Sequence, residues 1–324
     1  MNAGRERRVA VVGAGSIGVA FAIVFARAGW RVALQDPDDE RRRRVPQELR
    51  SRVAGLADCG LLDEAGEGLV ARVRIEATLD TALEGADLVQ ECAPETVELK
   101  QRLFAQLDAA APTAAILASS SSALPASRFA AELPGRGRCL VAHPGNPPYL
   151  LRIVELVPAP FTAPETVDRA DAFYREVGLV PVRVAREVEG FVFNRLQGAL
   201  LREAYCLVRD GVATVADIDT VMTEGLGPRW SIVGPFETVD LNTRGGIASH
   251  AEKMGPAYER MGAERGQHDP WTPELVARVV AERRAAVPLA QWDARVEWRD
   301  RMLMALVRHR QQSGHEPWSA AVAD

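Results

Sequence analysis

The chain has 324 residues, of which 47% are hydrophobic and 26% charged, with a formal net charge of −5. This length suits two domains, and this composition excludes a largely disordered chain. A mildly acidic chain offers no basic footprint for nucleic acid or for an anionic membrane. Its polar start predicts no secretion signal, and its most apolar stretch is broken by glycines, unlike a membrane span. Four cysteines without C-x-x-C spacing favour reduced thiols in the cytoplasm and no metal site.

Short apolar runs alternate with helical stretches over the first 188 residues. Strands are expected at 9–12, 31–36, 73–77, 87–92, 114–118, 139–142 and 153–157, with helices between several of them. Such alternation predicts an α/β domain with a doubly wound, mostly parallel sheet that helices cover on both faces. We assign residues 1–188 to this domain.

The pattern changes after residue 189, where strand-like runs stop and helical patterns continue. Gly190 and Gly211 bracket one predicted helix, and Thr214 followed by Asp217 is typical of a capping box that opens the next. Further helices are expected near 234–262, 272–286 and 290–312. Residues 189–324 are therefore predicted to form an all-helical domain.

A glycine-rich turn, Gly13-Ala14-Gly15-Ser16-Ile17-Gly18, follows the first predicted strand. With a helix after it and Asp36 ending the next strand, it fits the dinucleotide-binding pattern of a Rossmann-type domain. Its glycines permit a tight turn and a close approach to a pyrophosphate, which the helix N-terminus attracts. Asp36 can accept hydrogen bonds from the adenosine ribose, which predicts NAD. The residues assigned to the cofactor here are Gly13, Gly15, Ser16, Ile17, Gly18 and Asp36.

The arginine run Arg41–Arg44 leaves a second cofactor open. Such a cluster near the second strand could hold the 2′-phosphate of NADP. A solvated helix face is the plainer interpretation of the run. A clear preference for NADP in turnover would contradict the NAD prediction.

Three further segments place polar side chains at strand or helix ends. They are the serine run at 119–122, the segment from His143 to Tyr149 with the strand after it, and GFVFNR at 190–195. His143 lies at the end of a predicted strand, where such sheets place their ligands. A neutral imidazole is suited to take a proton near pH 7.

Several long motifs together resemble the 3-hydroxyacyl-CoA dehydrogenase superfamily over nearly the whole chain. They are VGAGSIG, QECAPE, AHPGNPPY, VELVP, GFVFNRLQ, DGVATVADIDTVMTEGLG and GPFETVDLN. Within the superfamily they resemble most the lambda-crystallin / L-gulonate 3-dehydrogenase branch. The resemblance implies an NAD-dependent oxidation of the 3-hydroxyl of a small hydroxy acid. It also implies a homodimer formed through the helical domain.

The resemblance assigns the chemistry to four residues. His143 would be the general base, and Glu155 would orient its ring and stabilise the imidazolium. Ser122 would hydrogen-bond the substrate oxygen, and Asn194 would help to hold substrate and histidine. Since the two members of the His–Glu pair lie 12 residues apart on different strand-like runs, the fold must bring them together.

The resemblance also adds three cofactor contacts. Asn146 would lie beside the nicotinamide, and Glu95 and Lys100 would contact the cofactor ribose. Lys100 and Lys253 are the only two lysines of the chain, and one of them falling at this position supports the match.

The substrate depends on residues beyond these motifs. A free carboxylate needs a cation, and Arg229 in GLGPRWSIVGP is the candidate because its planar fork suits bidentate binding. A salt-bridged surface arginine is the alternative for this residue. Gly145 and Arg152 replace the usual valine and proline of the branch near the expected substrate mouth.

The sequence also allows two other substrates and one function without catalysis. Trp230, Phe236 and Tyr149 could form part of an aromatic cage for the quaternary ammonium of carnitine. Arginines after Asp36 could serve an acyl-CoA substrate. A crystallin-like structural or NAD-binding protein is the non-enzymatic alternative, although such a relative would be free to lose the His–Glu pair.

Overall fold

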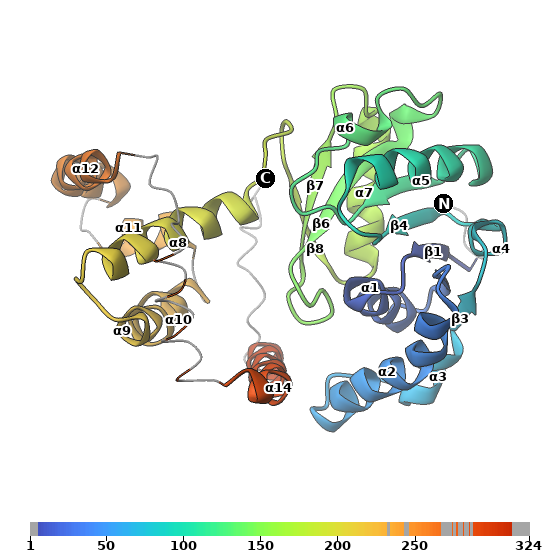
Figure 1. Cartoon of the computed structure of the whole chain (residues 1–324), viewed down its shortest axis with the longest axis horizontal. Coiled ribbons are helices and arrows are strands. Elements are labelled where there is room, and N and C mark those ends of the chain that lie inside the picture. Colours follow the sequence, from blue (N-terminus) through green and yellow to red (C-terminus); the bar gives the residue numbers. More distant parts are fainter. Residues whose placement is uncertain are drawn as a thin grey trace, which may run out of the picture. The chain divides into compact units, whose positions relative to one another are not determined.

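The computed structural model describes residues 6–231, 234–242, 246–266 and 288–312, with the single positions 274, 277, 281 and 285. The chain forms two compact units, drawn in Figure 1. One consists of Met1–Arg195 together with Glu297–Asp324, and the other of Leu196–Val296. Among the residues so described, no helix is long and apolar enough to cross a membrane.

The first unit is built on an eight-stranded sheet in the spatial order β3-β2-β1-β4-β5-β6-β7-β8. Neighbouring strands are parallel except for the β6–β7 pair, which is antiparallel. The strands are β1 (Arg8–Val12), β2 (Arg31–Gln35), β3 (Val73–Glu76), β4 (Leu88–Glu91), β5 (Ile116–Ser119), β6 (Cys139–Pro144), β7 (Ile153–Pro158) and β8 (Val180–Arg183). This confirms the predicted Rossmann-type sheet and adds β8, which the sequence pattern did not indicate.

Alternate residues of the central strand enter two separate hydrophobic cores. Val9 and Val11 of β1 join the cluster on one face, whereas Ala10 and Val12 join the cluster on the other. Because strand side chains alternate between faces, a sheet that is apolar at every position must be covered on both sides. The covering helices are α1 (Ser16–Arg27), α2 (Asp39–Asp58), α3 (Gly66–Ala71), α4 (Leu79–Leu83), α5 (Val97–Ala110), α6 (Ser127–Ala130) and α7 (Pro164–Glu176).

The second unit is helical in its described part, as predicted. Its elements are α8 (Phe193–Arg209), which begins in the first unit, α9 (Val215–Thr220), a π-helical turn (Val221–Leu226), α10 (Gly227–Trp230), α11 (Pro235–Asn242) and α12 (Gly246–Arg265). The Thr214–Asp217 capping box is present at the start of α9. The helix predicted over 272–286 lies largely outside the described residues.

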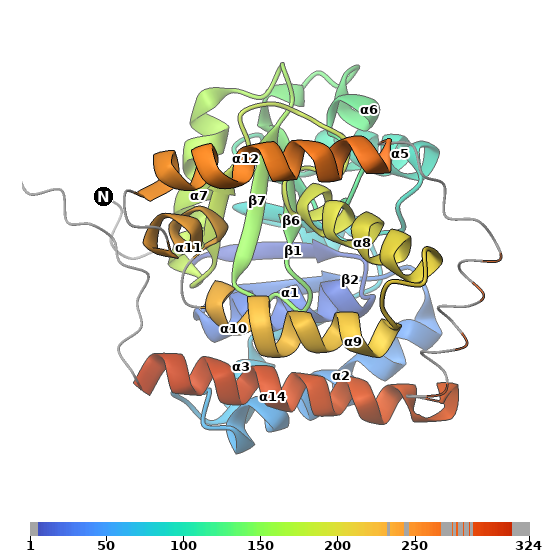
Figure 2. The ribbon, with the colours of Figure 1, turned by 90° about the vertical axis from the view of Figure 1, so that its left-hand side faces the viewer.

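Helix α14 (Trp292–Gln312) departs from the predicted domain division. From Glu297 onward it groups with the first unit rather than with the helical one. Met304 is buried in the core of the first unit, 4.0 Å from the position that a Cβ on Gly55 would take. In Figure 2 this helix runs along α2, on which Gly55 lies. The amphipathic pattern of this helix does not say which core it joins, so the sequence alone could not assign its described end to a unit.

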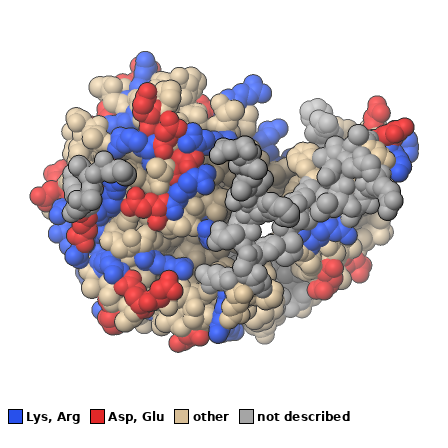
Figure 3. Space-filling view, turned by 180° about the vertical axis from the view of Figure 1, so that it is seen from behind, with Lys and Arg blue, Asp and Glu red and all other residues tan. Residues whose placement is uncertain are grey.

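Charges of both signs are interspersed over the described face of the first unit that Figure 3 shows. Many charged side chains of this unit pair with each other, as Arg138 does with Asp108 at 2.8 Å and Arg183 with Asp168 at 2.6 Å. This mixing agrees with the small net charge of the whole chain.

Candidate active site

The two predicted catalytic side chains are direct partners across the antiparallel strand pair. His143 on β6 lies opposite Glu155 on β7 in the register, so their side chains leave the sheet on the same face. His143 Nδ1 is 2.8 Å from Glu155 Oε2, and both residues are buried. The fold thus joins two residues that are 12 positions apart in the chain.

The second oxygen of Glu155 is held by the start of α8. Oε1 accepts the backbone amides of Val192 at 2.8 Å and Phe193 at 2.9 Å, which have no partner within the helix itself. Burial alone would raise the pKa of Glu155, but the hydrogen bonds from His143 and from these two amides outweigh it and lower that pKa below its ordinary value. An ionised Glu155 accepts a hydrogen bond from the Nδ1–H group of a neutral imidazole, which leaves the lone pair on Nε2 as the basic site.

Two phenylalanines form aromatic contacts with the imidazole. The rings of Phe191 and Phe193 lie 5.7 Å and 6.1 Å from the ring of His143, centre to centre. Phe191 is fully buried and has a φ of 51°, a conformation that costs energy for a residue with a side chain. Sequence reasoning missed Phe191, although it lies inside the motif that supplied Asn194.

Asn194 connects α8 to the turn that carries Ser122. Its Nδ2 donates to the backbone oxygen of Ser122 at 2.8 Å. Asn194 follows Phe193, whose amide binds Glu155. The first turn of α8 therefore touches both the His–Glu pair and the Ser122 turn, and it brings together all four residues to which the chemistry was assigned.

The glycine loop has the geometry that a dinucleotide requires. Gly13 has a φ of 97°, and a Cβ there would come within 2.8 Å of the backbone of Cys92. A Cβ on Gly18 would lie 1.8 Å from the Gly13 oxygen, so α1 can approach β1 this closely only with glycine. A Cβ on Gly15 would meet nothing within 4 Å, which leaves open space in front of the α1 N-terminus. These residues fit the pyrophosphate of NAD.

Asp36 and Ser16 are both tied to this loop. Asp36 Oδ2 accepts the amide of Ala14 at 2.8 Å, which fixes the carboxylate beside the loop. Arg52 of α2 donates to the hydroxyl of Ser16 at 2.9 Å and to its backbone oxygen at 3.0 Å. The sequence does not predict this contact, because Arg52 is one of many arginines on a charged helix.

The arginine run on α2 is satisfied by acids of the same helix. Arg41 pairs with Glu48 at 2.6 Å and Arg42 with Asp39 at 3.1 Å. The next two pair likewise, Arg43 with Asp39 and Arg44 with Glu40. These contacts favour the plain interpretation of the run, a salt-bridged helix face.

Lys100 of α5 is buried beside the end of β4. Its side chain is 1% exposed and pairs with Glu91, which is 0% exposed, through Nζ to Oε1 at 2.9 Å and to Oε2 at 2.8 Å. Nζ also donates to Ser119 Oγ at 3.2 Å. Three partners use the three protons of the ammonium. The contact of Lys100 with the cofactor ribose stays a prediction.

The remaining predicted site residues are spread over both units. Asn146 is exposed just beyond β6, and Glu95 lies in the β4–α5 connection. Arg229 is exposed on α10, in the helical unit. The two departures near the expected substrate mouth have packing explanations. A Cβ on Gly145 would lie 2.8 Å from the side chain of Ile153, and Arg152 donates to the oxygen of Gly178 at 2.7 Å.

A mostly parallel sheet with a glycine loop at its switch point, an acid after β2 and a buried His–Glu pair define an NAD-dependent dehydrogenase. Comparison of the chain with models of known protein families supports the same class of enzyme. Residues 8–188 match the 3-hydroxyacyl-CoA dehydrogenase, NAD binding domain, and residues 190–290 match the 3-hydroxyacyl-CoA dehydrogenase, C-terminal domain. The chain belongs to the 3-hydroxyacyl-CoA dehydrogenase family.

Individual relatives cover most of the chain. A lambda-crystallin homolog of Bos taurus is 42% identical over 94% of this chain and 96% of its own length. An L-carnitine dehydrogenase of Streptomyces griseus is 40% identical over 83% of this chain and 78% of its own. Among solved structures, 5-formyl-3-hydroxy-2-methylpyridine 4-carboxylic acid 5-dehydrogenase, an NAD+-dependent dismutase, matches with a TM-score of 0.81. It is 29% identical and covers 96% of this chain and 100% of that one.

Proposed function

We propose that the protein oxidises the 3-hydroxyl of a small hydroxy acid, with the His143–Glu155 pair as the general base. One observation carries this proposal: the buried 2.8 Å contact between the two side chains, with Glu155 further fixed by two amides of α8. A histidine oriented in this way by an ionised carboxylate is suited to accept a hydroxyl proton near neutral pH.

The residues divide the reaction as follows. Bound NAD would supply the hydride acceptor, with its pyrophosphate on the glycine loop and its adenosine ribose at Asp36. His143 takes the hydroxyl proton on Nε2, and Glu155 stabilises the imidazolium that results. Ser122 donates a hydrogen bond to the substrate oxygen, while Asn194 holds the Ser122 turn.

The pairing of the arginines on α2 favours a free acid over a CoA ester as the substrate. The arginines proposed for CoA phosphates already pair with Asp39, Glu40 and Glu48. Arg229, exposed on α10, is the proposed partner of the substrate carboxylate. L-Gulonate is the first candidate of this class.

L-Carnitine is the second candidate. Trp230 and Phe236, on the successive helices α10 and α11, are 39% and 78% exposed, and such rings can receive a quaternary ammonium. Two L-carnitine dehydrogenases, 40% and 39% identical to this chain, support this alternative.

The deciding experiment measures NADH formation at alkaline pH with L-gulonate, 3-hydroxybutyrate, L-carnitine and (S)-3-hydroxybutyryl-CoA, each with NAD and with NADP. We expect a free acid to be oxidised with NAD. His143→Gln should then lower kcat about 10²–10⁴-fold while the fold persists. Turnover of the CoA ester alone, or full activity of the variant, would contradict the proposal. NAD binding without any turnover would favour a crystallin-like role.

We further propose a cytoplasmic homodimer. None of the four cysteines, all of which lie in the described part of the chain, forms a disulfide, which supports a reducing compartment. Large apolar side chains are exposed on α8, α11 and α12 of the helical unit, which supports burial of this surface against a second copy. They are Leu196, Leu200, Phe236, Met254, Tyr258 and Met261.

A further inference from the structure

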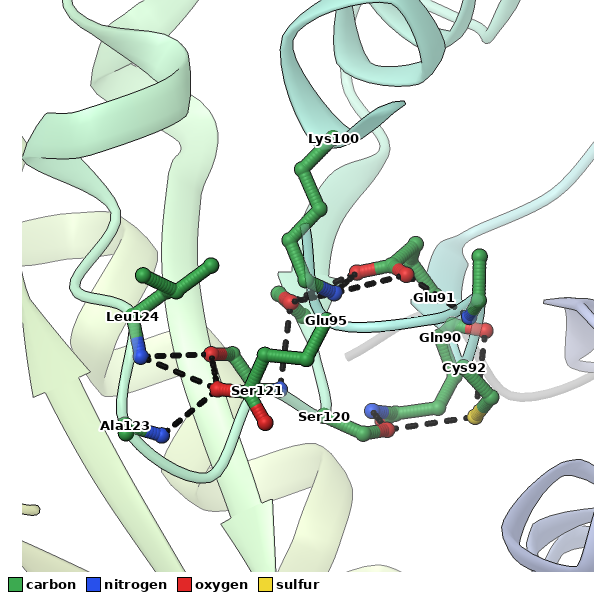
Figure 4. A network of polar contacts seen from close by, with 11 residues as sticks. Gln90, Glu91, Cys92, Glu95, Lys100, Ser120, Ser121, Ala123 and Leu124 are labelled. Atoms are coloured by element: carbon green, nitrogen blue, oxygen red, sulfur yellow. Dashed lines mark hydrogen bonds and ion pairs between the residues drawn. The ribbon is translucent and has the colours of Figure 1, made fainter. Parts of the chain in front are cut away.

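The turn that carries Ser122 is fixed by the side chain of Glu95 (Figure 4). Glu95 Oε1 accepts the hydroxyl of Ser121 at 2.5 Å and the amides of Ala123 at 2.7 Å and Leu124 at 3.0 Å. Ser121 Oγ in turn accepts the Leu124 amide at 2.9 Å. Within the described part of the chain, none of these hydrogen bonds uses the hydroxyl of Ser122. The backbone of the turn is therefore held while this hydroxyl stays available.

A second set of contacts joins the turn to the buried pair of Lys100 and Glu91. Ser119, the last residue of β5, donates from Oγ to Glu91 Oε2 at 2.6 Å. The same oxygen accepts Lys100 Nζ and the amide of Ser121, both at 3.2 Å. The contacts thus run from the charged pair through Ser119 and Ser121 to Glu95 without a break.

The orientation of Ser119 is fully determined by this arrangement. A hydroxyl has one proton to donate and two lone pairs that accept. In Ser119 the proton goes to Glu91, and the lone pairs receive Lys100 and the Ser121 amide. Removing the charged pair would leave the hydroxyl free to rotate and the Ser121 amide with a weaker acceptor.

A gain in the stability of the fold does not by itself explain why Lys100 and Glu91 are buried as an ion pair. A buried ion pair loses the hydration of both charges, and well-packed apolar residues are often as stabilising in its place. Lys100 and Glu91 are the most deeply buried ion pair among the described residues, and Ser119 joins them to the amide of Ser121, next to Ser122. Their location therefore points to a role in the geometry of the turn that carries Ser122.

We propose that Lys100 is a positioning residue for Ser122. With Glu91 it orients Ser119, which fixes Ser121 and, with Glu95, the backbone on either side of Ser122. This proposal rests on the proposed function, in which Ser122 contacts the substrate oxygen. A displacement of about 1 Å at a reacting group can cost about 10²-fold in rate, so such a support has a direct kinetic consequence.

Ser119→Ala tests the connection and leaves the charged pair in place. Its matched control is Ser120→Ala, because Ser120 bonds Gln90 at 2.8 Å and Cys92 at 3.1 Å and makes no side-chain contact with the turn. In Ser119→Ala we expect hydrogen–deuterium exchange at the amides of Ala123 and Leu124 to quicken about tenfold or more over the control. With the acid that the wild type oxidises, kcat should fall about 10–100-fold, while the dissociation constant for NADH stays within about twofold.

A double variant tests the charged pair itself. Lys100→Met alone would leave a buried carboxylate unpaired and destabilise the fold, so it is combined with Glu91→Leu. This variant should fold and should show the same faster exchange at the turn. An NADH dissociation constant that rises more than tenfold with unchanged exchange would overturn the proposal and leave the cofactor contact as the role of Lys100.

The exchange measurement separates this proposal from the proposed function. Faster exchange in both variants supports the positioning role even where no substrate of the panel is oxidised. If the wild type is active and Ser119→Ala matches Ser120→Ala in exchange and in kcat, the positioning role is wrong and the proposed function stands.

Discussion

Glu155 uses its two oxygens for different purposes, and an amide can replace only one of them. In Glu155→Gln the side-chain oxygen can still accept the amides of Val192 and Phe193. The NH₂ group then faces Nδ1 of His143 and forces the ring proton onto Nε2, where the base needs a lone pair. We expect kcat to fall about 10²–10⁴-fold with the fold retained, measured by steady-state kinetics on the acid that the wild type oxidises.

The acid sensitivity of the same variant provides a control. Because the pKa of folded Glu155 lies below its ordinary value of 4.5, its ionisation stabilises the fold at neutral pH. This stabilisation is lost as the pH falls through the folded pKa. Glutamine does not titrate, so the wild type and the variant should converge in free energy of unfolding on acidification. A gap that stays constant from neutral pH downward would show that this ionisation is not coupled to folding.

The sequence predicted the identity of several site residues but not all of their contacts. The resemblance supplied His143 and Glu155, and the structure makes them cross-strand partners. It also supplied Lys100, to which the structure adds a buried ion pair with Glu91. The same motif placed Glu91 nearby without showing its burial. The partner of a buried charge depends on how strand ends and helices pack, which motif spacing does not contain.

The glycines between β1 and the first turn of α1 have two different roles: Gly18 allows close packing, whereas Gly15 faces the space for the cofactor. Gly15 has φ −60° and ψ −176°, which alanine adopts freely, and its Cβ would enter open space. Gly18→Ala would instead place a Cβ 1.8 Å from the oxygen of Gly13 and push the helix off the strand.

Calorimetry with NAD and denaturant unfolding should therefore distinguish two alanine variants. Gly15→Ala should keep its free energy of unfolding within about 1 kcal/mol of the wild type and bind NAD at least about tenfold more weakly, because its methyl group occupies the pyrophosphate space. Gly18→Ala should lose about 1–3 kcal/mol of stability as well. Unchanged NAD affinity in Gly15→Ala would remove the glycine loop from the cofactor site.

Elements with a strong apolar pattern were predictable, and those defined by tertiary contact were not. The central strands β1 and β5 are short, mainly apolar runs buried on both faces, so their composition marks them. β8 is an edge strand with one buried residue and a proline, so its pattern resembles a loop. The end of α14 joins the core of the first unit through Met304. The local sequence pattern of the helix does not predict which core it packs against.

The chain passes between its two units inside helices, within α8 and again within α14. The first of these is fixed at its start by Glu155 and Asn194, so the residues that orient the base also anchor the helix that leads into the helical unit. A variant that loosens the start of α8 would therefore affect base and helix together. The exposed continuation of α8 is the surface on which the homodimer can be tested.

Leu196 and Leu200 lie four residues apart on one face of α8, and Leu196 is 64% exposed. A stable dimer would bury these side chains, since an apolar face of this kind is costly in water. We expect sedimentation equilibrium to give twice the mass of one chain for the wild type and a shift toward one chain for Leu196→Asp. Val182→Asp on β8, at an exposed apolar position of the other unit, is the matched control and should keep the dimer mass. A wild type that sediments as a single chain at micromolar concentration would refute the dimer, and equal dissociation of both variants would move the interface away from α8.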